Sequence, residues 1–123
     1  MSGGGAALAR KPKAKPAAPA SEDPRFLRIV RSYASEPGVT YGKLFSSFGL
    51  RVRGKIFAMV VRGRLVVKLP SDRVDALVAS GAARRFEPGP GRRMKEWADM
   101  SGEAPAWAGL VREAFRYVGG ARR

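Results

Sequence analysis

Two pairs of acidic residues have a spacing that could support acid–base chemistry. Asp72 with Asp75, and Glu96 with Asp99, are each three residues apart, a separation that makes side chains neighbours on a helix. Paired carboxylates can act as general acid and base. Asp72 and Asp75, however, fall at the start of an expected helix, where the helix dipole accounts for them. Glu96 and Asp99 fall in an expected strand, where this spacing separates the two faces. We therefore expect neither pair to be catalytic.

The remaining side chains offer little to an enzyme. The 123 residues include no histidine and no cysteine, which removes imidazole and thiolate groups, disulfides and the usual zinc and haem ligands. The ten acidic residues form no metal-like cluster, and Lys43, Ser46 and Ser47 suggest no nucleophile. No phosphate-binding loop, dinucleotide fingerprint or helix-turn-helix pattern is visible. We predict a protein that is not an enzyme, takes no cofactor and has no evident small-molecule substrate.

The chain is strongly basic, with 24 Lys and Arg against 10 Asp and Glu and a formal net charge of +14. Such a charge attracts polyanions, among them nucleic acid, in a salt-sensitive way. The alternative is that the charge serves solubility. No apolar run is long enough to span a membrane, and the N-terminus lacks the apolar segment of a secretory signal, so we expect no membrane association and a cytoplasmic location.

The first 20 residues differ in composition from the rest. They are rich in Gly, Ala, Pro and Lys, contain no acid, and have almost nothing to bury, so we predict a disordered basic tail over residues 1–20. Its lysines, Lys11, Lys13 and Lys15, would add non-specific affinity for phosphates, or would only make the protein more soluble. Residues 21–123 are expected to form one α+β domain.

Helical spacing of apolar residues predicts three helices. The first begins with Asp23 as cap and Pro24 in the first turn and ends near residue 35. The second follows Ser71 as cap and ends at Gly81, and the third covers residues 105–118. Residues 83–87 and 94–98 are expected strands joined by a Pro/Gly loop, and the conformation of residues 40–48 stays open. The expected order is α-β-β-β-α-β-β-α, a mostly antiparallel sheet with helices packed on it.

Residues 50–69 predict a three-stranded meander. Arg53-Gly54 and Arg62-Gly63 each separate two apolar runs, as in two-residue hairpin loops that need positive φ. This register places Leu50 opposite Phe57 and Met59 opposite Val66. One face is then entirely apolar and is the expected helix-covered core; it comprises Ile56, Ala58, Val60, Leu65, Val67 and Leu69.

The other face of the meander is a candidate protein-interaction surface. It is apolar too and is bordered by Lys55, Arg64 and Lys68; its members are Phe48, Leu50, Phe57, Met59 and Val66. A large exposed apolar patch commonly marks a partner surface, here a protein partner or a second copy of the chain. The alternative is that the first helix, the third helix or residues 40–48 cover it.

Arginines around the Pro/Gly loop are candidate nucleic-acid contacts. Arg84, Arg85, Arg92 and Arg93 could bind phosphates as a group, since arginine makes bidentate contacts. They could equally be solvated residues that protect a sheet edge. Neighbouring strand residues alternate faces, so Arg84 and Arg85 should not both join one patch in a regular strand. Trp97 and Trp107 are expected to be core or interface anchors.

Short motifs in and after the meander resemble the N-terminal domain of the TfoX/Sxy family, with a similar likeness to YjbR-type small domains. They are FGL at 48–50, GKIFA at 54–58, GRL at 63–65 and KL at 68–69, followed by Gly81, Phe86 and MKEW at 94–97. The resemblance implies a small α+β domain of the type seen in secretion chaperones, without known catalysis. The second domain of full competence regulators is not expected here, so a role in competence does not follow.

Two functions therefore remain open. The first is a regulatory or adaptor domain that acts through protein contact. The second is sequence-independent DNA binding by the basic tail and the arginine-rich loop.

Overall fold

The computed structural model describes residues 22–44, 47–100 and 106–120. The predicted tail, with Lys11, Lys13 and Lys15, lies outside these residues. The helices are α1 (Pro24–Arg31), α2 (Ser71–Ala79) and α3 (Trp107–Gly119). The strands are β1 (Val39–Leu44), β2 (Ser47–Val52), β3 (Lys55–Val61), β4 (Arg64–Lys68), β5 (Ala83–Arg85) and β6 (Trp97–Met100).

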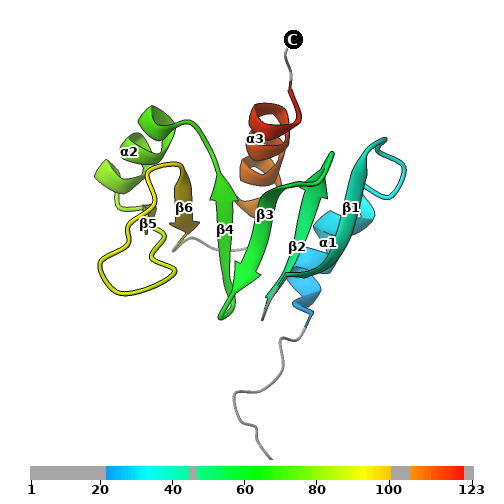
Figure 1. Cartoon of the computed structure of the whole chain (residues 1–123), viewed down its shortest axis with the longest axis horizontal. Helices are drawn as coiled ribbons and strands as arrows, with labels where there is room; N and C mark the ends of the chain where they lie inside the picture. The colour runs from blue at the N-terminus through cyan, green and yellow to red at the C-terminus, as the bar shows by residue number, and fades with distance from the viewer. Residues whose placement is uncertain (1–21, 45–46, 101–105, 121–123) are drawn as a thin grey trace, which may run out of the picture.

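The strands form a single antiparallel sheet in the order β1-β2-β3-β4-β6-β5 (Figure 1). This confirms the predicted α+β class and order of elements, with β1 added in the segment whose conformation was open. β1 pairs along its whole length with the next strand, β2, so pairing between strands decides its conformation. β1 and β5 are the two edges of the sheet.

The helices lie on one face of the sheet. Buried side chains from α1, α2 and α3 (Phe26, Val74 and Val111) join one core cluster with strand residues such as Val67. Figure 1 shows the strands in front of α1 and α3. The opposite face of the sheet has no helix over it in the described part of the chain.

Both predicted hairpin turns are present. Arg53 and Gly54 have φ values of 50° and 81°, and Arg62 and Gly63 have φ values of 52° and 77°. Two consecutive positive φ values are typical of the tight turn whose twist matches that of the flanking strands. The pairs Val52 with Lys55 and Val61 with Arg64 close the turns as predicted.

The register of the first hairpin is different from the prediction. Leu50 pairs with Ala58 rather than with Phe57, and Arg51 pairs with Ile56, because a β-bulge leaves Phe57 as an extra residue in β3. A bulge inserts one residue in one strand and breaks the alternation of side chains. Beyond the bulge the second hairpin keeps its expected register, with Met59 opposite Val66.

The helix ends follow the local signals in part. The Asp23 side chain accepts a hydrogen bond from the Arg25 amide and Pro24 begins α1, as predicted. α1 ends at Arg31 and is followed by turns, earlier than expected. Pro70 is the N-cap of α2, so Ser71 is the first helical residue and not the cap. α3 ends at Gly119, and its C-cap Gly120 has the left-handed conformation that glycine adopts readily.

Candidate functional site

The bulge divides the predicted interaction face between the two sides of the sheet. The Phe57 ring lies 5.9 Å from that of Tyr33 and 5.6 Å from that of Phe115 in α3, so it is part of the helix-covered core. Leu50 belongs to the same buried cluster. Phe48 stacks on Tyr41, whose ring is 6.3 Å from that of Phe26 in α1.

The predicted grouping of Phe48, Leu50 and Phe57 with Met59 and Val66 is therefore wrong. Only Met59 and Val66 lie on the helix-free face, since the prediction assumed unbroken alternation along β3. The same bulge moves Ile56 from the expected core face to the helix-free face, opposite Arg51.

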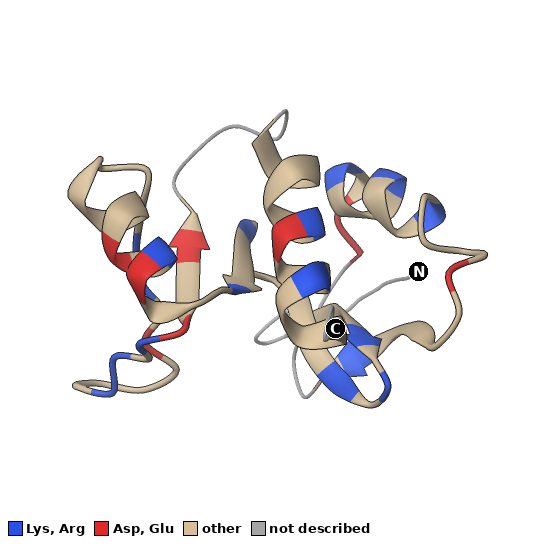
Figure 2. Ribbon diagram, turned by 90° about the horizontal axis from the view of Figure 1, so that it is seen from above, with Lys and Arg blue, Asp and Glu red and all other residues tan. Residues whose placement is uncertain are grey.

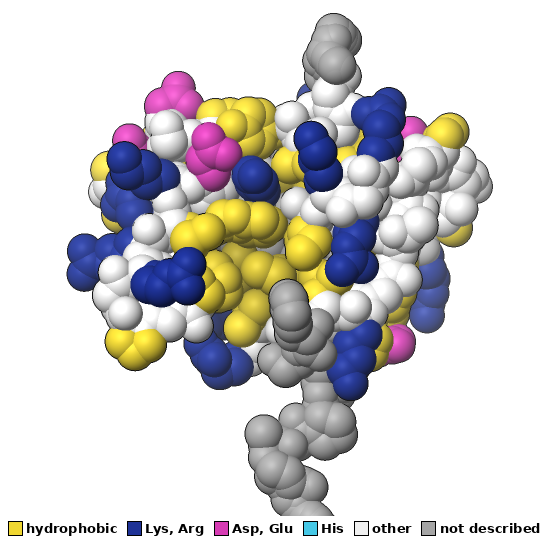
Figure 3. Space-filling model, in the orientation of Figure 1, with side chains coloured by type: hydrophobic (Ala, Val, Ile, Leu, Met, Phe, Trp, Pro, Cys, Tyr) yellow, Lys and Arg dark blue, Asp and Glu magenta, His cyan; other side chains and the backbone are white. Residues whose placement is uncertain are grey.

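The helix-free face carries an apolar hollow of about 360 Å³. Three partly exposed residues of β3 line its floor, namely Ile56, Met59 and Val61. Phe86 and Pro88, from the loop after β5, form a wall of the same hollow. Figure 3 shows this face with a central hydrophobic area bordered largely by Lys and Arg. The sequence patterns did not indicate Ile56, Val61 or Phe86 as surface residues.

Two buried residues lie beneath this face and outside the core cluster on the helix side. Leu44 is 4% exposed and Val66 is 0% exposed, yet neither belongs to the helix-side cluster. Leu44 reaches across β2 over Gly49, where a Cβ atom would come within 2.4 Å of the Leu44 side chain and 2.7 Å of the Ala58 carbonyl oxygen. Gly49 thus allows Leu44 to pack close to Met59 on β3.

A buried carboxylate lies on the same face. Asp99 is 7% exposed and is held by Arg64 and Arg84, whose Nε atoms each donate to a different carboxylate oxygen. Two guanidinium partners offset the cost of burying the charge. Because both oxygens already accept hydrogen bonds from cations, Asp99 is poorly placed to act as a general base.

The acidic pairs considered from the sequence are engaged with other residues: Asp72 and Asp75 are neighbours on α2, and Glu96 and Asp99 lie on different faces. Glu96 lies near Lys68, with 3.9 Å between the charged atoms, and interacts with Tyr117 of α3, whereas Asp99 faces the other side of the sheet. Asp75 binds Arg85. In the described residues no group of acidic side chains could hold a metal ion.

The predicted nucleic-acid contacts partly come together. Arg84, Arg85 and Arg93 line a small hollow of about 300 Å³ at the β5 edge. Arg84 and Arg85 are neighbours in the edge strand β5, and they alternate between its two faces as expected for a regular strand. Their ion pairs point to opposite sides, to Asp99 on the helix-free face and to Asp75 on α2.

Acidic partners compensate part of the charge in this arginine group. Arg93 lies 3.6 Å from Glu87, so three of the four predicted residues are in ion pairs, and Arg92 is exposed. The charge of the group is therefore compensated in part, since Asp99 is shared with Arg64 and Arg92 is in no ion pair among the described residues.

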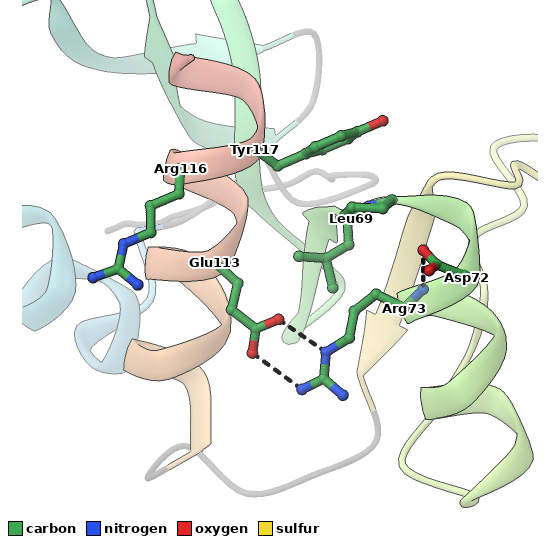
Figure 4. A pocket seen from close by; sticks show the side chains of 7 residues that line it. Leu69, Asp72, Arg73, Glu113, Arg116 and Tyr117 are labelled. Atoms are coloured by element: carbon green, nitrogen blue, oxygen red, sulfur yellow. Dashed lines mark hydrogen bonds and ion pairs between the residues drawn. The ribbon is translucent and has the colours of Figure 1, made fainter. Parts of the chain in front are cut away.

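A second cleft, of about 570 Å³, lies between α2 and α3 (Figure 4). Leu69 forms part of its floor, and Arg73 spans it to donate two hydrogen bonds, of 2.8 and 3.0 Å, to Glu113. Tyr117 borders the cleft and is 40% exposed. Partial burial and a hydrogen bond with Glu96 raise the pKa of Tyr117, so it stays neutral and unsuited to act as a base. The cleft holds no nucleophile and joins two helices through an ion pair.

The two tryptophans have different roles. Trp107 is 2% exposed in the core, as predicted, and the Arg25 guanidinium lies 4.6 Å from its ring centre. Trp97 is half-buried and pairs with Lys68, whose ammonium group lies 5.9 Å from the ring centre.

No helix in the described residues is long and apolar enough to cross a membrane.

Comparison with known proteins identifies the fold family. The model of the TfoX N-terminal domain matches residues 32–114, from the end of α1 into α3. No curated protein matches the chain. The match covers the whole sheet described above and two thirds of the chain, and it supports a domain of regulatory or adaptor type. The chain belongs to the TfoX N-terminal domain family.

Proposed function

We propose that this protein is a non-enzymatic adaptor domain that binds a protein partner through the helix-free face of its sheet. The observation that carries the proposal is the apolar hollow around Met59. It exposes parts of Ile56, Met59 and Val61 side by side, and no helix of the described residues lies over them. Apolar surface of this kind is stabilised by burial against a partner.

The charges around the hollow favour a partner with an acidic rim over a second copy of the chain. Arg62 and Glu87 both line the hollow, and Arg51 lies on the same face. Glu87 is in an ion pair with Arg93, whereas neither Arg51 nor Arg62 is in an ion pair with a described residue. Figure 3 shows basic side chains on most sides of the apolar area. Two copies meeting through this face would bring like charges together, which opposes association.

Site-specific crosslinking tests this proposal. A photo-crosslinking amino acid is placed at Met59 and, as a matched control, at Tyr117, which is also partly exposed and apolar but lies on α3. We expect a defined protein to be captured from position 59 and not from position 117. Arg62→Glu should abolish that capture, because it reverses a charge at the rim.

Three results would overturn the proposal. One is the absence of any product from position 59, another is the same product from both positions, and the third is a crosslink of the chain to itself. Sedimentation of the wild-type protein and of Met59→Asp checks the last result. If the wild type is a dimer and Met59→Asp is a monomer, the face is the interface of a homodimer.

Sequence-independent DNA binding is the second candidate function, and the observation that favours it is the net charge of +14. Of the residues first considered for it, Lys11, Lys13 and Lys15 lie outside the described residues, Arg92 is exposed, and Arg84, Arg85 and Arg93 are in ion pairs, so we assign it to another surface.

A further inference from the structure

Some arginines on the helix side of the sheet have no acidic partner among the described residues, unlike most of the arginines around the loop after β5. α1 and α3 both lie on the helix side of the sheet and are linked at two points. Near their first turns, the Arg25 guanidinium lies 4.6 Å from the Trp107 ring centre. Just after α1, the Tyr33 ring lies 5.5 Å from that of Phe115 in α3. Side chains at the same height therefore meet across the two helices.

Four exposed arginines lie on these two helices: Arg28, Arg31, Arg112 and Arg116. Arg112 and Arg116 are four residues apart, so they lie on one side of α3, about 6 Å apart along its axis. Arg116 lines the cleft between α2 and α3 together with Asp72 and Glu113, and Figure 4 shows its side chain turned from the Arg73 and Glu113 bridge toward α1. Burial raises the pKa of Tyr33 and the charges of Arg112 and Arg116 act against that rise, which places both near the end of α1.

The acidic residues nearby do not neutralise this α1–α3 arginine surface. α1 contains no acid, and the one acid of α3, Glu113, binds Arg73 on the side facing α2 (Figure 2). Asp23 binds Arg25. Glu36 is the nearest other acid, through its effect on Tyr33. None of the ion pairs among the described residues includes one of the four arginines.

The composition of this surface favours phosphate as the ligand. Like charges one turn apart disfavour the helix, so four arginines without acids are best stabilised by a bound polyanion. The guanidinium fork matches phosphate in a bidentate way. Ala108 and Gly109, exposed one turn before Arg112, leave room for a backbone to approach. A membrane surface would call for large apolar side chains there, and a single strand would call for stacking aromatics.

We propose that the α1–α3 arginine surface binds the phosphate backbone of a nucleic-acid duplex without reading its sequence. The surface lies on the helix side of the sheet, opposite the apolar hollow, so the two sites can be occupied together and this proposal does not depend on the adaptor function. Of the four arginines only Arg112 falls within the family match at residues 32–114, so most of the surface comes from segments that the family model does not cover.

Binding of a fluorescent DNA duplex of about 20 base pairs by the full chain, measured across a salt series, tests this proposal. Arg112→Glu with Arg116→Glu is compared with Arg92→Glu with Arg93→Glu, which changes the net charge equally on the loop. We expect the α3 variant to lose at least about tenfold in affinity at low salt and the salt slope to flatten by about two. The loop variant should stay within about twofold of wild type.

The pair Arg28→Glu with Arg31→Glu should behave like the α3 pair. Arg112→Gln with Arg116→Gln, checked by circular dichroism, keeps the test valid if the glutamates impair folding. Equal losses in the α3 and loop variants, a loss in the loop variant alone, or no binding by wild type at low salt would overturn the proposal. Two further results would overturn the proposal: polyglutamate that competes as strongly as the duplex at equal charge, or anionic vesicles that bind as strongly as the duplex at equal charge. Either result means that the protein has a general affinity for anions.

Discussion

The two faces of the sheet are built from the same strands but have opposite relations to the rest of the chain. On the helix side, Phe57, Ala58 and Val67 are fully buried under α1 and α3 and their neighbours. On the other side, Met59 and Val61 stay partly exposed around a hollow. The first face is where the free energy of folding comes from, and the second is free to bind. A single bulge in β3 assigns side chains to the two faces.

The test with the largest expected effect on stability is the removal of one apolar side chain from each face. Phe57→Ala should lower the free energy of unfolding by about 3 to 5 kcal/mol, because it leaves a cavity between Tyr33 and Phe115. Met59→Ala should cost no more than about 1 kcal/mol, because Met59 is only partly buried. Urea denaturation measures both. Similar costs would show that something covers the free face.

The next test concerns the paired glycines under the hollow, Gly42 and Gly49. Gly49→Ala should destabilise the fold by about 1 to 3 kcal/mol, because its Cβ would collide with Leu44 and the Ala58 carbonyl. Gly42→Ala is the matched control, since a Cβ there meets nothing within 4 Å. We expect it to be neutral or slightly stabilising in thermal unfolding. A neutral Gly49→Ala would contradict the close packing of Leu44 across β2.

The tyrosines give a pH-dependent test of the covered face. Burial raises the pKa of Tyr33, so the folded state holds this proton more tightly than the unfolded chain does. Its contribution to stability is therefore complete below the ordinary tyrosine range and is lost as the pH rises through the raised value. Denaturation followed into that alkaline range should show less loss in Tyr33→Phe than in wild type. Tyr117→Phe, at an exposed position, should change the profile less.

The smallest expected effect separates the two hairpin turns. Arg62 has a positive φ and borders the free face, so Arg62→Asn should stabilise the protein by less than about 1 kcal/mol, since asparagine tolerates this conformation. Arg53→Asn should gain nothing, because the Arg53 guanidinium donates a hydrogen bond to the Gly119 carbonyl at the end of α3. Equal gains in melting temperature would mean that the hydrogen bond between Arg53 and the Gly119 carbonyl does not contribute to the stability of the protein.

Much of the fold was predictable from local patterns. The α+β class, the three helices, both Arg-Gly turns and the membership of the TfoX N-terminal domain family follow from short stretches of sequence. β1 was not predictable in the same way. Its residues carry mixed signals, and pairing with β2 decides their conformation.

The candidate site was predictable only in part. Met59 lies on the predicted face and is partly exposed, whereas Val66 lies on that face but is fully buried, and Phe48, Leu50 and Phe57 were assigned to the wrong face. No residue in β3 marks the bulge, since an aromatic residue suits either position of a strand. Phe57 takes the extra position where it can pack between Tyr33 and Phe115, and both of these residues come from distant segments.

By itself, the sequence determined where the chain turns, which segments are helical and how strongly basic the protein is, because these properties depend on neighbouring residues or on composition alone. Only the tertiary structure decided which side chains share a face and which arginines have acidic partners. Asp99 brings Arg64 and Arg84 together although each lies far from the other in sequence, while Arg112 and Arg116 lie near Tyr33 and are in no ion pair among the described residues. Such groupings arise from contacts across the fold, and spacing along the chain does not encode them.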